Sequence, residues 1–162
     1  MAVGNTFGAT ALSSYGGFWL SYAIINTPGG FQIAAAYAQD NSHADLNHAV
    51  GFFLAGWFIF TTLLLLCTLR STVAFFLLFF FLDMAFLMLT VGHFILDGVG
   101  EVNHGLIKAG GVFGLLAAFV AWYNALAGIA DTSNSFFVIP VAHFPWSEKA
   151  REERVKTERE TV

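Results

Sequence analysis

Four long stretches that contain almost no charge limit how this chain can fold more than any other feature. They cover residues 7–25, 49–69, 73–95 and 106–129. Each is about as long as the twenty apolar residues that a helix needs to cross the roughly 30 Å hydrocarbon core of a bilayer. Inside a bilayer the backbone must satisfy its own hydrogen bonds, so a spanning segment is helical. The sequence therefore predicts an all-α polytopic membrane helical bundle with about four transmembrane helices.

Charge is concentrated near the end of the chain. Of the 18 Asp, Glu, Lys and Arg residues, ten lie between Glu148 and Glu160. Acidic and basic residues alternate there at spacings near three and four, which is typical of a solvated helix or a disordered end. We therefore predict a transmembrane helical domain over residues 1–132 and a cytoplasmic tail over residues 133–162. A nucleic-acid partner is not expected, because the chain offers no basic face.

The few basic residues predict the orientation of the chain in the membrane. Short cytoplasmic loops carry an excess of Lys and Arg. Arg70 lies between the second and third stretches, and five basic residues lie in the tail. An even number of spans then places both termini in the cytoplasm.

Hydroxyl side chains gather in the first stretch, where Thr10, Ser14 and Tyr15 lie within a few turns of one another. Ser and Thr hydroxyls in a helix commonly bond back to carbonyls of the same helix. Tyr15 differs from them, because a phenol in the middle of a span must find a partner or line a cavity.

Asp83 is an acid within the third stretch. An ionised carboxylate at a helix centre costs about 2.5 to 3.5 kcal/mol on insertion scales. Such a residue should face protein or water. It is either a proton relay or substrate-path residue, or a hydrogen-bonded residue that packs between helices.

The last stretch carries small residues on one helical face: Gly110, Gly114, Ala118, Ala121 and Ala125. Such a stripe lets helices approach closely. Packing is the first interpretation of the stripe, and a pore-lining role is compatible with it.

A metal site could be drawn from His93, Asp97, Glu101 and His104. These residues straddle a glycine-containing loop, however, and convergent ligands are not indicated. We expect no metal, no cofactor and no enzymatic activity.

Three segments resemble one known family. They are GNTFGATALSSYGGFWLSYAI (residues 4–24), WFIFTTLLLLCTLR (residues 57–70) and FFLLFFFLDMAFLMLTVG (residues 75–92). The chain is similar over most of its length to the acetate uptake transporter family, which comprises the succinate-acetate permeases of bacteria and their fungal relatives. The amino-acid sequences of these segments are closer to those of the fungal members.

The resemblance implies transport of acetate and similar small monocarboxylates across the plasma membrane. Transport would be proton-coupled or through an anion channel, along a path within each protomer of a homo-oligomer, a hexamer in the family. By motif, Tyr15 and Leu82 match the family's constriction residues, and Ala121 matches a position linked to substrate size. Other path residues would be Thr10, Ser14 and Leu78.

This sequence also differs from the family pattern at its beginning. Family members have six spans, and this sequence begins where the third begins. An Asn-Pro-Ala-Pro-Leu-Gly-Leu signature and the family's constriction phenylalanine are absent. The alternative hypothesis is a truncated, non-transporting membrane subunit that acts only through helix packing with sibling protomers.

Overall fold

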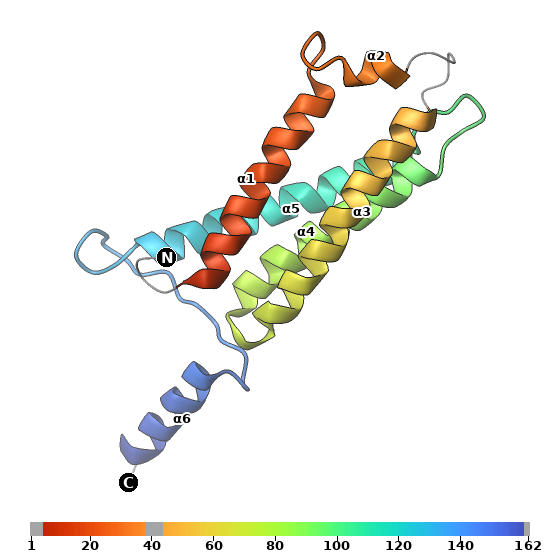
Figure 1. Cartoon of the computed structure of the whole chain (residues 1–162). Coiled ribbons are helices and arrows are strands. Elements are labelled where there is room, and N and C mark those ends of the chain that lie inside the picture. Colours follow the sequence, from red (N-terminus) through yellow and green to blue (C-terminus); the bar gives the residue numbers. More distant parts are fainter. Residues whose placement is uncertain (1–4, 38–43, 161–162) are drawn as a thin grey trace.

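The computed structural model of the chain describes residues 5–37 and 44–160. Within those residues four long helices form one bundle, and a charged helix projects from one end of it (Figure 1). The long helices are α1 (Thr6–Asn26), α3 (Ala44–Cys67), α4 (Val73–Phe94) and α5 (His104–Ile129). The other elements are the short helix α2 (Ile33–Tyr37), the 3-10 turn η2 (Thr68–Arg70) and the projecting helix α6 (Glu148–Glu160).

Three helices in the described part of the chain are long and apolar enough to cross a membrane by length and composition. They are Ala44–Arg70, Val73–Phe94 and His104–Ile129. Helix α1 has 21 residues and is long enough, but its glycines and hydroxyl side chains make it less apolar than the other three. The all-α fold and three candidate spans are therefore confirmed, and the placement of α1 in the membrane stays a prediction.

Three long helices begin at a side chain that caps them. The side-chain oxygens of Asn5, Thr72 and Asn103 accept hydrogen bonds from backbone amides three residues later, at the starts of α1, α4 and α5. Such a cap satisfies one of the four amides that a helix start leaves without an intrahelical partner. Local sequence therefore determines where these helices begin.

Helix α4 is the centre of the bundle and packs closely against α5. A Cβ atom added to Gly110 of α5 would lie 2.8 Å from the Leu89 side chain and 3.3 Å from the Ala85 carbonyl oxygen of α4. A Cβ atom added to Gly92 of α4 would lie 2.9 Å from Ile107 of α5. Small residues on both helices thus permit the close approach of their backbones.

Helix α1 contacts α3 and α4 chiefly through large aromatic side chains. Phe18 is buried, and its ring centroid lies 5.7 Å from that of Phe53, 5.2 Å from that of Trp57 and 5.1 Å from that of Phe86. Aromatic pairs at these separations contribute about 0.5–1.5 kcal/mol each beyond the burial of their area. Ring packing, not close backbone contact, therefore positions α1.

The outward faces of the long helices carry large apolar side chains that remain exposed among the described residues. Examples on α3 and α5 are Phe52, Ile59, Leu63, Leu115 and Phe119, which are all exposed. A protein in water rarely leaves so much contiguous apolar surface open. Lipid chains are the environment that suits these faces.

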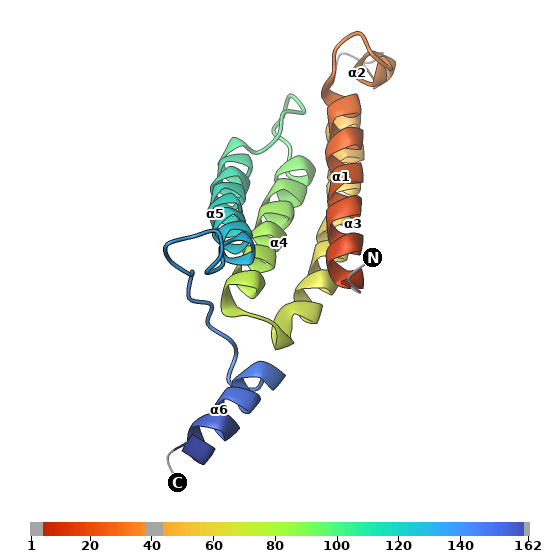
Figure 2. The ribbon, with the colours of Figure 1, turned by 90° about the vertical axis from the view of Figure 1, so that its left-hand side faces the viewer.

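The segment that follows α5 returns to the bundle before α6 begins. The Val73 amide donates to the Ala142 carbonyl at 3.0 Å, and the Trp146 indole N–H donates to the Leu69 carbonyl at 2.7 Å. Ser147 is buried, whereas α6 beyond it extends away from the bundle (Figures 1 and 2). The part of the predicted tail around residues 142–147 is thus bound to the α3–α4 connection, and the boundary at residue 132 stays a prediction.

Candidate functional site

An apolar groove of about 570 Å³ lies between α1, α4 and α5. Figure 2 shows α1 and α5 on either side of α4. None of the described residues that line the groove carries a charge. The groove is open along one side, because Leu12 and Trp19 at its edge are 78% and 64% exposed.

Tyr15 lines the groove from α1 and binds α3 through its hydroxyl group. Its Oη atom lies 2.9 Å from Oγ1 of Thr61, which is completely buried. Its ring stacks on that of Phe86, with centroids 6.5 Å apart, and lies 6.3 Å from that of Phe79. Since Thr61 is not part of the groove, the Tyr15 hydroxyl is turned to the helix interface and the ring forms part of the groove wall.

Asp83 lies on α4 next to Leu82 but does not line the groove. It is buried, and its Oδ1 atom accepts a hydrogen bond of 2.9 Å from the Thr62 hydroxyl of α3. A buried polar group needs such a partner, because an unpaired one carries the full cost of desolvation. The structure therefore places Asp83 in a polar contact between α3 and α4.

Four of the site residues predicted from the sequence come together in the groove: Tyr15, Leu78, Leu82 and Ala121. The other two path residues lie elsewhere on α1. Thr10 is exposed, and Ser14 lines a separate hollow with Phe53, Gly56, Trp57 and Phe60 of α3. Helical periodicity explains this division, because residues one position apart point about 100° away from each other around the helix.

The small residues on one face of α5 have two kinds of surroundings along the length of the helix. Gly110 packs against α4, whereas Gly114, Ala118 and Ala121 line the groove. A Cβ atom added to Gly114 would meet nothing within 4 Å. Packing and lining therefore both occur, at different turns of one helix.

Several residues that shape the site were not predicted from the sequence. Thr61 and Thr62 anchor Tyr15 and Asp83, and the rings of Phe79 and Phe86 contribute to the groove wall. Thr61 and Thr62 could have been singled out from the sequence, because they are two adjacent polar residues inside an uncharged span. Phenylalanines are too frequent in the α4 sequence for spacing alone to single out these two.

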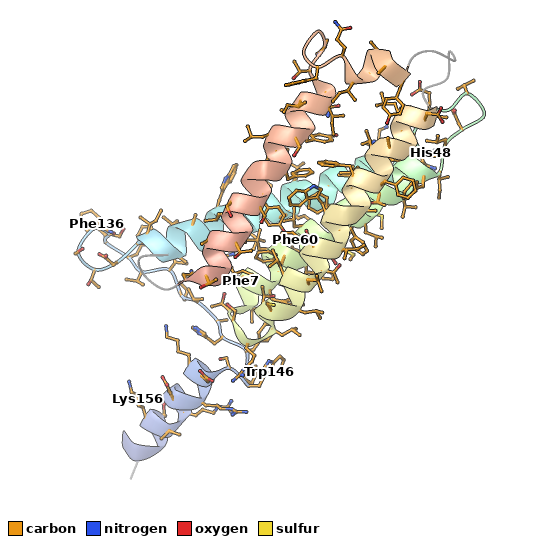
Figure 3. All side chains as sticks on the ribbon, viewed as in Figure 1. Phe7, His48, Phe60, Phe136, Trp146 and Lys156 are labelled. Carbon is orange, nitrogen blue, oxygen red and sulfur yellow. The ribbon has the colours of Figure 1, made fainter. Side chains whose placement is uncertain are left out.

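A second cavity, of about 580 Å³, adjoins the groove at the Arg70 end of the bundle. Asn5 and Phe75 line both hollows. Its other walls come from the start of α1, the end of α3, the α3–α4 connection, the end of α5 and the returning tail. The residues are Phe7, Cys67, Thr68, Arg70, Ser71, Thr72, Asn124, Ala127, Gly128 and Val141. Figure 3 shows Phe7 near this end of α1 and Phe60 farther along the bundle on α3.

At the opposite end, the α4–α5 loop is ordered by Asp97. Its carboxylate accepts hydrogen bonds of 2.9 Å from the backbone amides of both Glu101 and Val99. These bonds, that from Glu101 first, lower the pKa of Asp97 below its ordinary value. Among the described residues, no group of three or more His, Cys, Asp or Glu side chains is arranged to hold a metal ion.

The fold and the groove together define a class: an α-helical bundle with lipid-compatible outer faces and an uncharged hollow between its helices. Residues 1–146 match the GPR1/FUN34/yaaH family. A match over most of the chain is sufficient to establish membership, so the chain belongs to this family and is an integral membrane protein with helical spans. The family resemblance seen in the sequence is therefore confirmed.

Curated relatives support the same membership. The chain is 69% identical to Acetate permease A of Emericella nidulans over 163 residues, which is 100% of this chain and 55% of that protein. It is 48% identical to Ammonia transport outward protein 2 of Saccharomyces cerevisiae over 149 residues, 92% of this chain and 50% of that protein. The chain thus spans about half the length of these relatives.

A solved structure has a similar fold. The bacterial acetate channel SatP matches with a TM-score of 0.57 and 27% sequence identity, over 85% of this chain and 69% of that chain. The fold of the chain is therefore similar to that of an experimentally determined membrane protein structure.

Proposed function

We propose that the chain takes part in the membrane transport of acetate and similar small monocarboxylates, and that it is not an enzyme. The observation that carries this proposal is the groove, which brings Tyr15, Leu78, Leu82 and Ala121 together from three helices. Support comes from the relatives, which include an acetate permease and a bacterial acetate channel.

The chemistry of the groove favours a particular form of the substrate. An apolar wall accommodates the methyl group of acetate, whereas a carboxylate without a partner there would bear a large desolvation cost. Since the described lining residues carry no charge, transfer together with a proton is favoured over transfer of the bare anion. We therefore propose proton-coupled movement of the acid through the groove.

Size selection would come from the part of the groove that Tyr15 and Leu82 line. Tyr15 and Leu82 approach it from α1 and α4, and both pack against the cluster of Phe18, Leu54 and Phe86. Hydrophobic constrictions of this kind select by diameter and by dehydration. Ala121, on the α5 wall, is in a position to set the width available to the acyl chain.

Asp83 is assigned to helix packing in this proposal, because its carboxylate is bound by Thr62 away from the groove. Replacing it with asparagine (Asp83→Asn) keeps an acceptor for the Thr62 hydroxyl and removes the titratable proton. Uptake of labelled acetate should then keep its dependence on pH. A flattened pH profile would instead make Asp83 the proton relay.

Reconstitution of the purified chain into liposomes tests transport directly. Labelled acetate should enter the vesicles, and Leu82→Ala should raise butyrate uptake relative to acetate uptake. Leu63→Ala is the matched control, because Leu63 is an exposed leucine on the outer face of α3. Equal butyrate-to-acetate ratios in both variants would remove Leu82 from the constriction.

A second function is favoured by the open side of the groove. Leu12, Trp19 and Trp122 line it and are all exposed, which suits a surface that sibling protomers cover. The chain would then be a membrane subunit that acts through helix packing and does not transport by itself. Liposomes that contain the chain at verified density and take up no acetate would support this alternative.

A further inference from the structure

The cavity at the Arg70 end of the bundle, here called the vestibule, adjoins the groove. The two hollows share Asn5 and Phe75 in their walls. The vestibule is more polar than the groove, because Thr72 and Asn124 contribute to its lining. A solute that leaves the groove at this end therefore enters the vestibule first.

Arg70 is the charged residue among the described residues that line the vestibule. Its guanidinium group has five N–H donors in a planar fork that matches a carboxylate. One terminal nitrogen of Arg70 donates to Oε1 of Glu148 at 2.9 Å. Within the described ranges 5–37 and 44–160 Glu148 is the side chain bound to this fork, so other donors can meet a second carboxylate.

The ion pair of Arg70 with Glu148 is a weak one. The two side chains are 68% and 81% exposed. Water and salt screen such a pair, so it contributes little to stability. A carboxylate that reaches the vestibule can therefore compete with Glu148 for the guanidinium group.

We infer that the vestibule is a binding site for the small carboxylate anion and that Arg70 attracts it there, with Glu148 as an internal competitor. This inference rests on the proposed function for the identity of the ligand. It adds a site outside the groove, at which the substrate is held as the anion before or after it carries a proton across the apolar part. Glu148 would tune the occupancy of the site through the position of α6.

Cys67 provides a direct probe of this site. It is the single cysteine of the sequence, it is exposed, and it lines the vestibule with Arg70. The purified chain in phosphatidylcholine vesicles is labelled in parallel with an anionic and a cationic methanethiosulfonate reagent. The ratio of the two rates reports the local potential, since the reactivity of the thiolate is common to both reactions.

Arg70→Gln should lower the anionic-to-cationic rate ratio about two- to fivefold, the scale of one solvent-exposed charge interaction. Glu148→Gln should raise the ratio. Lys149→Gln is the matched control, because Lys149 is an exposed charge on the same helix that does not line the vestibule, and it should leave the ratio nearly unchanged. Equal ratios in Arg70→Gln and the parent would overturn the inference.

Acetate binding is measured as a fall in the rate ratio when sodium acetate replaces sodium chloride at equal ionic strength. The parent should show this fall, and Arg70→Gln should not. A ratio that acetate leaves unchanged in the parent overturns the inference. An effect that disappears when phosphatidylglycerol is added would assign the site to lipid headgroups, and it would overturn the inference as well.

The labelling does not require that acetate crosses the membrane, so the two proposals fail separately. Acetate-dependent labelling without uptake into liposomes contradicts transport and leaves the vestibule site in place. Uptake with no effect of Arg70→Gln on labelling contradicts the vestibule site alone.

Discussion

Tyr15 serves two surfaces at once, because its ring lines the groove and its hydroxyl group is bound on α3. A phenol in an apolar bundle is stable only with a partner, and Thr61 supplies it from a fully buried position. The orientation of the ring thus depends on a residue that never contacts the groove.

Thr61→Val should lower the free energy of unfolding by about 1–3 kcal/mol, the cost of leaving a buried polar group unpaired. Thr10→Val is the control, since Thr10 is an exposed threonine on α1, and it should change stability little. Denaturant titration in detergent measures both variants. In the double variant with Tyr15→Phe the loss should be clearly less than the sum, and additive losses would contradict the Tyr15–Thr61 contact.

Asp97 makes the α4–α5 loop sensitive to acid. Its folded-state pKa is lowered, so its hydrogen bonds contribute stability that is present above the ordinary Asp value of about 3.9. That contribution is lost as the pH falls through the lowered pKa. Hydrogen exchange at the Val99 and Glu101 amides, corrected for the intrinsic dependence on pH, should lose protection in that range. Protection that persists in Asp97→Ala would refute this account.

Among the helices, α4 connects the bundle because it contacts α3 through Asp83 and α5 through Ala85 and Leu89. The close contact with α5 depends on the absence of a side chain at Gly110. The next residue, Gly111, faces open space, so the two neighbouring glycines on one helix have different roles.

This difference yields a paired prediction. Gly110→Ala should destabilise the protein by about 1–3 kcal/mol through overpacking against Leu89 and Ala85. Gly111→Ala should be neutral or stabilise by up to about 1 kcal/mol, because alanine is the better helix former. Thermal denaturation in detergent compares them. Equal melting temperatures would contradict the close α4–α5 approach.

In the whole molecule, the returning tail holds the end of the bundle while α6 lies outside it. Phe144 stacks on Trp146 with ring centroids 4.8 Å apart, and it also meets Phe76 of α4 at 5.6 Å. By contrast, Phe136 lies fully exposed on the loop that precedes this contact (Figure 3). The tail therefore has a docked part around residues 142–147 and a helix that projects from it and meets the bundle through Glu148.

Limited trypsin digestion should remove α6 first, at exposed basic residues such as Arg151 and Lys156. The remaining bundle should keep its melting temperature, because cleavage after Arg151 leaves the Arg70–Glu148 pair and the docked residues 142–147 on the bundle. Trp146→Ala should lower the melting temperature, since it removes the hydrogen bond to Leu69 and the stack on Phe144. A large loss of stability on removal of α6 would show that this helix is part of the fold.

The sequence by itself determined the helical fold, the approximate helix ranges and the family. These properties depend on local facts: runs of apolar residues, capping side chains such as Thr72, and a motif over residues 4–24. The periodicity of a helix also marked the face of α5 that carries Gly110 and Ala121. Backbone hydrogen bonding and hydropathy act over short distances, so they can be followed along the chain.

Only the tertiary structure decided which polar residues meet and which faces enclose a hollow. Thr61 is hydrogen-bonded to Tyr15, and Thr62 to Asp83, across interfaces between helices. The rotation of each helix about its own axis, which brings these side chains together, depends on the packing of many aromatic rings. The same rotation leaves Thr10 and Ser14 outside the groove. The tertiary structure also places Glu148 of the tail next to Arg70. Contacts between distant segments are set by how large side chains interlock in three dimensions, and no single stretch of the sequence contains that information.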